Sequence, residues 1–404
     1  MIPRLYDSLP AGHFGASRQM LFVSGPRQVG KTTTARAAGA ERECHYLNWD
    51  NQDHRLVLLR GPAALAEFVD LDVLRADKPL LVLDEVHKYP GWRDLLKGTF
   101  DTYGTRVDML VTGSAMLNVF SHAGDSLMGR YLPYRMHPLS VAELIRPTLP
   151  QHGELVRPPL RPPEGALDAL LDFGGFPEPF ERGEKRFWNQ WRRLRTQLLF
   201  KEDLRDLTRI QELGQMEVLA QLVASSAGQL VNYTWFAKQV RVSVNTVRRW
   251  LETLEALYYC FAVRPWYRNV ARALRKEPKY YLWDWSQIAD AGARAENLVA
   301  CALLKAAHLW TDHGFGEFGL HFLRDKEKRE VDFVVTRDSE PWFLVEVKSS
   351  ANVRVSPTLG YFQAQTHAAH AFQVAAHADF VDADCFTRKV PTVVPASTFL
   401  SQLV

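Results

Sequence analysis

The residues best suited to do chemistry lie in a glycine-rich stretch near the amino terminus. They follow the pattern G-x-x-x-x-G-K-T, as Gly25, Pro26, Arg27, Gln28, Val29, Gly30, Lys31 and Thr32, with Thr33 next. The glycines let backbone N–H groups curl around phosphates, the lysine faces the β- and γ-phosphates, and the threonine hydroxyl can bind Mg²⁺. An apolar run at 20–23 and a helix-prone stretch at 33–40 supply the flanking strand and helix. The pattern predicts a site for ATP and Mg²⁺ rather than an ordinary turn.

An acidic pair follows the next strongly apolar run. Residues 80–83 (LLVL) are typical of a strand buried on both faces, and Asp84 and Glu85 come directly after them. Ligands of open α/β sheets bind at the carboxyl ends of the strands. We expect Asp84 to hold Mg²⁺ through water and Glu85 to polarise the attacking water. The alternative is an acidic strand end that only faces solvent.

Hydroxyl side chains end a further expected strand at 107–111. Either Thr112 or Ser114 is placed to sense the γ-phosphate or to orient the water, although Thr112-Gly113-Ser114 could also be a simple turn. Arg130, just before an apparent fifth strand, is a candidate finger that reaches the γ-phosphate of a neighbouring subunit. That role predicts a homo-oligomer, with a ring as one form. The alternative is an Arg130 that pairs with an acid of its own domain.

A second set of chemical residues lies in an alternating pattern near the carboxyl terminus. Residues 330–337 and 342–349 alternate polar and apolar positions around a turn at 338–341, which predicts a hairpin. Its apolar face is expected to carry Val331, Phe333, Val335, Phe343, Val345 and Val347. A register symmetric about Ser339 places Asp332 opposite Glu346, on the face that also carries Glu330 and Lys348.

Two facing carboxylates beside an ammonium group suit a hard cation. Asp332, Glu346 and the Val347 carbonyl would bind Mg²⁺, and Lys348 would activate or orient the hydrolytic water. This D…E-x-K arrangement resembles the restriction-endonuclease-like nuclease superfamily, and Glu296, on a helix expected at 293–307, fits that superfamily's additional acid. The alternatives are an ordinary charged strand face, or a nuclease fold kept only as a binding module.

A helix-turn-helix pattern occupies residues 233–257. A short helix at 235–240 precedes a turn at 241–243, where Ser243 is the expected N-cap of a second helix. The second helix would turn Arg248 and Arg249 outward, as a DNA recognition helix does. A basic wing at 258–281, which includes Arg272 and Lys276, would add phosphate contacts. Such modules also serve as pure packing units.

The wider sequence resembles a known group of ATPases. The segments GPRQVGKTT, LLVLDEVHKYPGW, LVTGSA and LMGRYLPYRMHPLSVAEL resemble AAA+ superfamily ATPases of bacteria and archaea with a C-terminal restriction-endonuclease-like domain of uncharacterised function. The resemblance implies an α/β chain with an AAA-type parallel-sheet P-loop core (1–147), a helical lid (164–213), a winged helix (214–285) and an α/β restriction-endonuclease-like domain (286–404). A proline-rich stretch at 147–163 marks the first boundary. Tryptophans at 188 and 191 share helical spacing with Leu194, Leu198 and Leu199, which indicates core packing.

Composition excludes several protein classes. The 404 residues include 49 Lys and Arg against 46 Asp and Glu, so net charge alone argues neither for nor against nucleic acid. The four cysteines have no metal-like spacing and are expected to be reduced, as in a cytosolic protein. The amino terminus lacks the apolar region of a signal peptide, and no apolar run is long enough for a membrane span. We therefore expect a cytoplasmic protein with no membrane contact.

Two hypotheses follow for function. The first is an ATPase that acts on DNA and couples ATP turnover to a C-terminal Mg²⁺-dependent nuclease-type domain. The second is a regulatory switch ATPase whose winged helix and inactive nuclease-like tail bind a protein partner. A small-molecule P-loop kinase is disfavoured, because it leaves the helix-turn-helix and the hairpin unexplained.

Overall fold

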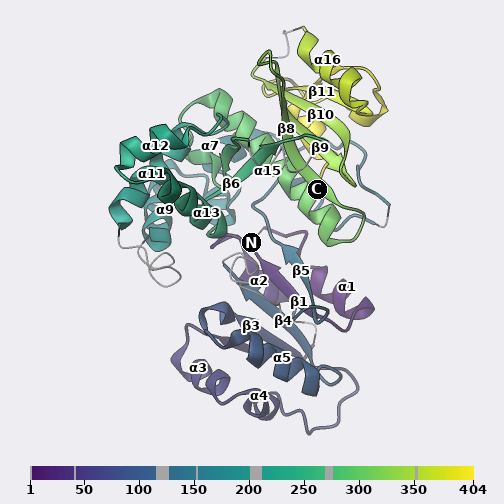
Figure 1. The fold of residues 1–404 in the computed structure, drawn as a ribbon. Coiled ribbons are helices and arrows are strands. Elements are labelled where there is room, and N and C mark those ends of the chain that lie inside the picture. Colours follow the sequence, from purple (N-terminus) through teal and green to yellow (C-terminus); the bar gives the residue numbers. More distant parts are fainter. Residues whose placement is uncertain are drawn as a thin grey trace.

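The chain is an α/β protein with two sheets (Figure 1). The computed structural model describes residues 2–40, 42–114, 127–151, 153–200, 212–268, 276–350 and 354–404. No helix in these ranges is both long enough and apolar enough to cross a bilayer.

The first sheet has five parallel strands in the order β2-β3-β4-β1-β5. The strands are β1 (Met20–Ser24), β2 (Cys44–Asn48), β3 (Leu80–Asp84), β4 (Asp108–Gly113) and β5 (Tyr131–Arg135). All residues of β3 and β4 are buried, because helices cover both faces of a parallel sheet. The P-loop and Ser114 follow β1 and β4, and Asp84 is the last residue of β3, so the shared strand direction brings them to one edge.

Seven helices among the described residues accompany this sheet. They are α1 (Leu9–Ala16), α2 (Lys31–Ala37), α3 (Gln52–Leu59), α4 (Pro62–Phe68), the 3₁₀ turn η1 (Val86–Lys88), α5 (Trp92–Tyr103) and α6 (Val141–Ile145). The predicted helix after the P-loop begins at Lys31 itself, two residues earlier than expected. Asn51 is the N-cap of α3, and its side chain accepts hydrogen bonds from two backbone N–H groups of the first turn.

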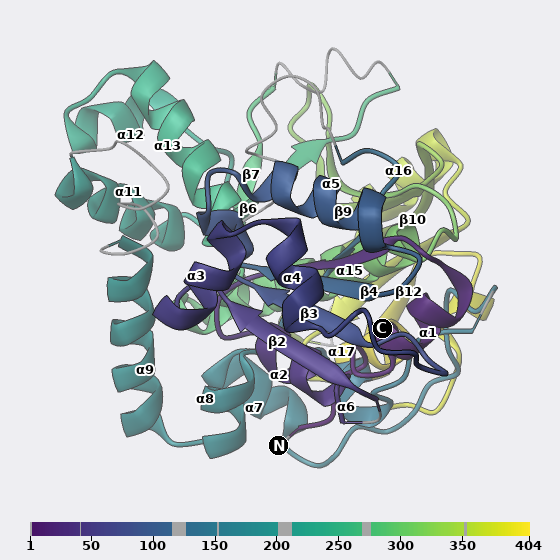
Figure 2. The ribbon, with the colours of Figure 1, turned by 90° about the horizontal axis from the view of Figure 1, so that it is seen from below.

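The expected helical lid forms α7 (Ala166–Phe173), α8 (Pro177–Arg182) and α9 (Lys185–Leu198). Trp188 and Trp191 of α9 are buried, which confirms their predicted packing role. Leu194 is 59% exposed, so the prediction that it belongs to the same core stripe is wrong. Figures 1 and 2 show α9, α11, α12 and α13 on one side of the molecule, away from α16.

The helix-turn-helix elements are present as predicted. They are α12 (Tyr233–Val240) and α13 (Val244–Ala256), and α11 (Leu213–Ser225) precedes them. The Ser243 side chain accepts a hydrogen bond from the Thr246 backbone N–H, which confirms the N-cap. Val247, Leu251 and Leu254 of α13 are fully buried.

The second sheet has seven strands in the order β12-β11-β10-β9-β8-β6-β7. They are β6 (Cys260–Pro265), β7 (Lys279–Leu282), β8 (Phe318–Arg324), β9 (Glu330–Arg337), β10 (Glu340–Lys348), β11 (His370–Ala375) and β12 (Thr392–Pro395). Strand β6 pairs with β8 at Arg264↔His321 and Pro265↔Phe322. The strands of the expected wing therefore continue the C-terminal sheet, and residue 285 marks no break between two sheets.

The predicted hairpin is β9 and β10, with two differences in detail. The connecting turn is Asp338-Ser339 alone, both with positive φ as two-residue hairpin turns require, so strand pairing resumes at Glu340. The register pairs Val345 with Phe333, which is the expected symmetry about Ser339. The β8–β9 register shifts between the pairs His321↔Val334 and Leu323↔Val331. Val331 therefore packs in a separate cluster from Phe333, and the single apolar face predicted for both is wrong.

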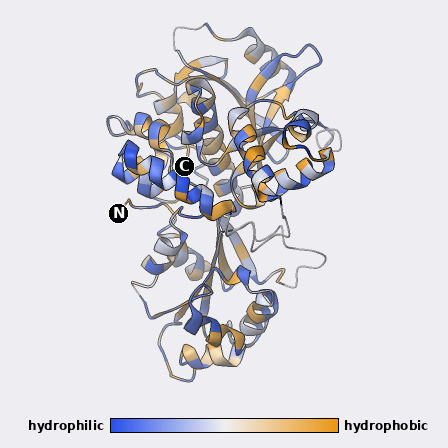
Figure 3. Cartoon of the chain, turned by 90° about the vertical axis from the view of Figure 1, so that its left-hand side faces the viewer, coloured by the Kyte–Doolittle hydropathy of each residue, from blue (hydrophilic) through white to orange (hydrophobic). Residues whose placement is uncertain are grey.

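Long helix α15 (Ala291–Asp312) lies between the two sheets and contacts β5 of the first and β8 of the second (Figure 1). The remaining elements are η3 (Trp285–Gln287), α16 (Pro357–Thr366), η4 (Cys385–Thr387) and α17 (Ala396–Ser401). Figure 3 shows that individual helices carry both hydrophilic and hydrophobic residues, as amphipathic packing requires. All four cysteines are free thiols, in line with the sequence.

Candidate nucleotide site and C-terminal acidic cluster

The glycine positions of the P-loop are fixed by space and backbone conformation. A side chain at Gly25 would collide with the carbonyl oxygen of Met136. Gly30 has a φ of +111°, which disfavours any residue with a Cβ atom, and it is the N-cap of α2. The loop therefore directs the first turn of a helix toward its mouth, where backbone N–H groups can bind phosphate.

Lys31 lies inside this loop. Its side chain is buried, and its Nζ donates hydrogen bonds to the carbonyl oxygens of Gly25 at 2.9 Å and Pro26 at 2.8 Å. The ammonium group is thus held at the mouth of the loop by weak neutral acceptors. Phosphate oxygens carry full negative charge and are stronger acceptors, so they can replace these carbonyls.

The two residues predicted to hold Mg²⁺ are in direct contact. Thr32 Oγ1 donates to the buried Asp84 carboxylate at 2.8 Å, and Asp84 also accepts from Tyr46 OH at 2.5 Å and from the Thr112 hydroxyl. Burial and the Asp84 charge raise the pKa of Tyr46 to about 12, so it remains a donor. A hydroxyl and a carboxylate at this distance fit the oxygen ligands that Mg²⁺ prefers.

Glu85 is held next to Ser114, a contact that the sequence did not predict. The Ser114 hydroxyl donates to Glu85 Oε2 at 2.9 Å. Glu85 has a φ of +55°, a conformation that costs free energy in a non-glycine residue and is commonest at functional sites. Strand β3 thus ends abruptly, and the turn directs the Glu85 side chain toward the end of β4.

Lys31, Thr32, Asp84 and Glu85 line one cavity of about 570 Å³, a size typical of small-molecule sites. Arg27, Gln28, Tyr46 and Asn48 contribute to it from the first sheet and its loops. Pro177, Glu178, Glu181 and Leu198 contribute from α8 and α9 of the lid. The cavity therefore lies between the sheet edge and the lid.

Arg4 is a site residue that the sequence did not reveal. Its guanidinium donates to the carbonyl oxygens of Val29, in the P-loop, and His137, the latter at 2.7 Å. It also pairs with Glu143 of α6, with Nε 2.8 Å from Oε1. A lone arginine close to the amino terminus carries no local signal for this role.

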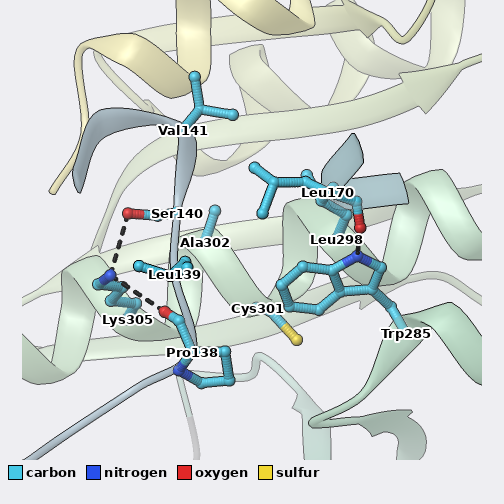
Figure 4. A pocket seen from close by; sticks show the side chains of 10 residues that line it. All are labelled: Pro138, Leu139, Ser140, Val141, Leu170, Trp285, Leu298, Cys301, Ala302 and Lys305. Atoms are coloured by element: carbon cyan, nitrogen blue, oxygen red, sulfur yellow. Dashed lines mark hydrogen bonds between the residues drawn. The ribbon is translucent and has the colours of Figure 1, made fainter. Parts of the chain in front are cut away.

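Glu143 in turn binds Lys305 of α15, and all three charged side chains are buried. Lys305 Nζ also donates to the Pro138 carbonyl at 3.1 Å and to Ser140 Oγ at 3.0 Å (Figure 4). Burial lowers the pKa of Lys305 to about 8, although Glu143 opposes that shift. The P-loop and α15 are therefore joined through Arg4, Glu143 and Lys305.

Two further contacts fasten α15 to β5 and its continuation. Arg135 pairs with Asp312 at 2.6 Å, and a ring nitrogen of His137 lies 2.9 Å from one of His308. Burial holds the pKa of both histidines well below the usual value, so both rings are neutral at pH 7. The nucleotide core and the second sheet therefore share a polar interface along α15.

Arg130, the candidate finger, is bound within its own domain. Its Nε lies 2.6 Å from Asp101 Oδ1 and its Nη2 lies 2.9 Å from Oδ2. This is the alternative that the sequence left open. A role in a neighbouring subunit's site would require this exposed ion pair to open.

The C-terminal acids take three different donors. Asp332 Oδ2 accepts from the Val347 N–H at 2.8 Å, Glu346 Oε1 pairs with Lys348 at 2.8 Å, and Glu296 Oε1 accepts from Tyr281 OH at 2.7 Å. Burial raises the pKa of Glu296 to about 7, and the Asp332 charge adds to the shift. Burial likewise raises the pKa of Asp332. Glu346 Oε2 is buried without a hydrogen-bond partner among the described residues.

The expected convergence of Glu296, Asp332 and Glu346 on one metal position is not seen. Among the residues that the structure describes, no group of three or more His, Cys, Asp or Glu side chains is arranged to hold a metal ion. The physical reason is that each carboxylate is turned to a nearby donor. The three acids interact electrostatically without sharing a ligand position.

The predicted DNA-contacting residues differ in their surroundings. Arg248 and Arg249 are exposed on α13, with the Arg248 guanidinium 3.9 Å from the centre of the Tyr233 ring. Lys276 is exposed, whereas Arg272 lies outside the described residues. Lys279, at the end of the same basic segment, is 3% exposed and pairs with Glu330 at 2.6 Å, so it is not available for phosphate contacts.

Three family matches cover most of the chain. Residues 17–145 match the family described as AAA domain. Residues 164–292 match the domain of unknown function DUF8612, and residues 291–398 match the domain of unknown function DUF4143. The first match covers the P-loop, Asp84, Glu85 and Ser114.

Relatives are similar along much of their length. Uncharacterized proteins of Mycobacterium tuberculosis and Mycobacterium bovis are each 23% identical over 349 residues, 84% of this chain and 72% of theirs. An uncharacterized protein of Haemophilus influenzae is 21% identical over 277 residues, 65% of this chain and 64% of its own.

Solved structures give more distant similarities. A Walker-type ATPase of Pyrococcus abyssi has a TM-score of 0.45 at 14% identity, over 73% of this chain and 96% of that one. The Orc1 protein of Aeropyrum pernix in complex with DNA has a TM-score of 0.32 at 14% identity, over 73% and 89%. The AAA domain match and the P-loop geometry together identify the N-terminal part of the chain as an AAA-type P-loop ATPase domain, and the C-terminal region matches a domain of unknown function.

Proposed function

We propose that the protein hydrolyses ATP with Mg²⁺ and acts on DNA, and that ATP turnover is coupled to its C-terminal domain. The observation that carries the hydrolytic part is the pairing of Thr32 with Asp84 and of Ser114 with Glu85 at the mouth of one loop. Phosphoryl transfer needs a cation on the phosphates and an oriented water, and these two pairs supply a residue for each.

The role of each site residue in hydrolysis follows from its charge and its position. Lys31 binds the β- and γ-phosphates, and Thr32 and Asp84 hold Mg²⁺, which neutralises charge that develops on the phosphates. Glu85 orients the attacking water, and the Ser114 hydroxyl fixes the direction of the Glu85 carboxylate. Glu85→Gln should therefore keep ATP binding and lose turnover.

Coupling to the C-terminal domain is supported by the buried contacts along α15. This helix carries Lys305, which joins the P-loop through Glu143 and Arg4, and it also carries Glu296. Helix α15 is one continuous helix of 22 residues. A shift of the P-loop on ATP binding would therefore move this helix as a rigid element and reach Glu296, near its N-terminal end.

A nuclease-type activity is supported by the chemistry of the acids. The unpartnered Glu346 Oε2 and the raised pKa values of Asp332 and Glu296 are the marks of carboxylates that a divalent cation would stabilise. Mg²⁺ would be held by Asp332, Glu346 and the Val347 carbonyl, with Glu296 as an additional acid, and would supply a Lewis acid beside the scissile phosphate. Lys348, whose pKa is raised by Glu346 against the effect of burial, would orient the water.

DNA contact is supported by the exposed cations at the start of α13. Arg248 and Arg249 face outward from a helix-turn-helix whose core positions are filled, which is how a recognition helix presents its polar residues. Arg272 and Lys276 are proposed to add phosphate contacts.

The alternative is a switch ATPase whose helix-turn-helix and C-terminal domain bind a protein and cut nothing. It is favoured by one observation, which is that the three acids are not arranged to hold a metal. DNA-stimulated hydrolysis supports the first function. Hydrolysis that is insensitive to DNA, together with a protein partner, supports the second.

Action of Arg130 in trans is a further part of the proposal and requires a homo-oligomer. Mixing Arg130→Ala and Lys31→Ala subunits tests it, because a mixed oligomer restores some intact sites only when the arginine acts across subunits. No rescue at any ratio, with mixed oligomers shown to form, would leave Arg130 as the partner of Asp101 alone.

One experiment tests the whole proposal. ATP turnover and strand cleavage are measured together on single-stranded, duplex and branched DNA, with Mg²⁺ or Mn²⁺. Glu85→Gln serves as the control that binds ATP without hydrolysis, and Lys348→Ala as the control that lowers cleavage alone. An absence of cleavage on every DNA, with DNA-independent turnover, would replace the first function by the switch.

A further inference from the structure

A buried histidine beside Glu85 is not explained by packing. His87 belongs to η1, the short turn that follows Glu85, and is only 8% exposed. Neither of its ring nitrogens has a hydrogen-bond partner among the described residues. A buried donor without a partner lowers the stability of a fold, and an apolar side chain would fill the same space without that cost.

The Glu85 carboxylate, which is proposed to orient the water, lies just beyond hydrogen-bond distance of the His87 ring. His87 Nε2 lies 3.7 Å from Glu85 Oε2, the same oxygen that accepts from Ser114 at 2.9 Å and that lies 3.9 Å from Lys88 Nζ. A shift of less than one ångström would turn the histidine contact into a hydrogen bond. Lys88 is itself bound to Asp50 at 2.7 Å, so it is partly committed elsewhere.

We propose that His87 is a positioning residue for ATP hydrolysis, which donates a hydrogen bond to the Glu85 carboxylate and holds it toward the γ-phosphate. This inference rests on the ATPase activity proposed above. The positive φ of Glu85 places its side chain at a sharp turn, where contacts with neighbouring side chains fix its direction. His87 contacts Glu85 from outside the nucleotide cavity, since it is not among the residues that line it.

The charge state of the ring fits the role. Burial lowers the pKa of His87, with Glu85 acting against the shift and Lys88, Lys31 and Arg27 acting with it. The ring is therefore neutral at pH 7 and has one N–H to donate. A neutral donor orients the carboxylate without neutralising the charge that Glu85 needs to polarise water.

The test compares substitutions of His87 that keep or remove a donor. His87→Gln places an amide N–H near the position of Nε2, whereas His87→Leu fills the space without a donor. We expect His87→Leu to lower kcat about tenfold to a hundredfold, the effect of one hydrogen bond to a charged group, with ATP affinity unchanged. We expect His87→Gln to recover most of the rate. A packing role predicts the opposite order, because leucine suits an apolar site better than glutamine.

A double-mutant cycle with Glu85→Gln makes the test specific. If His87 acts through Glu85, His87→Leu has no further effect on the residual turnover of Glu85→Gln. If His87→Leu does not fold, His87→Met takes its place in the cycle. Equal kcat for wild type and His87→Leu, or additive losses in the cycle, would overturn the inference while the ATPase activity stands. A wild-type protein without turnover would overturn both.

Discussion

The buried contact between the P-loop and α15 makes a quantitative prediction for Glu143→Gln. The Glu143 carboxylate is fully buried and accepts from Arg4 Nε at 2.8 Å, from the Leu5 N–H at 2.9 Å and from Lys305. The substitution leaves two buried cations without a counter-charge. Breaking a buried ion pair in this way costs about 3–5 kcal/mol of unfolding free energy. We expect Glu143→Gln to lose a large part of the stability of the core.

A matched control is available on the surface. Glu67 pairs with Arg60 at 3.1 Å, and both side chains are about two-thirds exposed, at 72% and 66%. Glu67→Gln removes the same charge from a similar distance, but exposed pairs contribute only about 0–1 kcal/mol. The loss of unfolding free energy in Lys305→Met should lie between those of Glu143→Gln and Glu67→Gln. This variant removes one cation and leaves the ion pair of Arg4 with Glu143 intact.

The difference in unfolding free energy between wild type and Glu143→Gln depends on pH with a definite sign. Burial alone would raise the pKa of Glu143, but Arg4 and Lys305 outweigh it and hold the pKa below its ordinary value. The folded state therefore favours the ionised form more than the unfolded state does. Its contribution is fully present above the unfolded pKa of about 4.5 and is lost as pH falls through the folded pKa. Through the titration of Glu143, the gap in unfolding free energy between wild type and Glu143→Gln should narrow as pH falls into the acid range.

The measurement is denaturant unfolding at pH 7 and in acid, followed separately by tryptophan fluorescence and by ATP binding, because a chain of this size need not unfold in one step. ATP affinity should fall in Glu143→Gln, since Arg4 would hold Val29 less firmly. A Glu143→Gln protein within about 1 kcal/mol of Glu67→Gln at pH 7 would show that the buried network contributes no more than a surface pair.

Three further predictions concern the ATP site, DNA and the C-terminal acids. Lys31→Ala should abolish tight ATP binding, measured by calorimetry, because it deletes the cation that faces the phosphates; near-normal affinity would contradict the assignment. Replacing Arg248 and Arg249 by Ala should weaken DNA binding across sequences and flatten its salt dependence, with ATP affinity unchanged, since lost phosphate contacts reduce counterion release; an unaltered salt slope would assign this helix to packing. Asp332→Ala should raise the thermal stability of the metal-free protein by relieving repulsion with Glu296, and should remove any stabilisation by added Mn²⁺; equal Mn²⁺ effects in wild type and variant would exclude Asp332 as a ligand.

Much of the nucleotide site could be predicted from sequence because its signals are local. The P-loop pattern, the apolar run before Asp84 and the hydroxyls at 112–114 each sit at a strand end, and parallel strands bring their carboxyl ends to one edge. The Ser243 cap and the register of the C-terminal hairpin were also predicted, since caps and hairpins depend on residues close in the chain.

The sequence could not reveal contacts between residues far apart in the chain. Arg4 and Glu143 are separated by 139 positions, and Glu143 and Lys305 by 162, so no local pattern links them. The burial of His87 beside Glu85 depends on how η1 packs against β4 and α5. The directions of the three C-terminal carboxylates depend on which hydrogen-bond donors the folded chain places nearest to each. The sequence could therefore predict that the three acids lie close enough to interact electrostatically. It could not predict that each accepts from a different donor.

Sequence by itself thus determined which chemical groups stand at the ends of the strands, because hydrophobic period and turn residues fix strand limits locally. Tertiary structure alone decided that the strands of the expected wing join the C-terminal sheet, and that α15 connects that sheet to the P-loop. The physical reason is that strand pairing and buried ion pairs form between segments that the chain brings together only on folding.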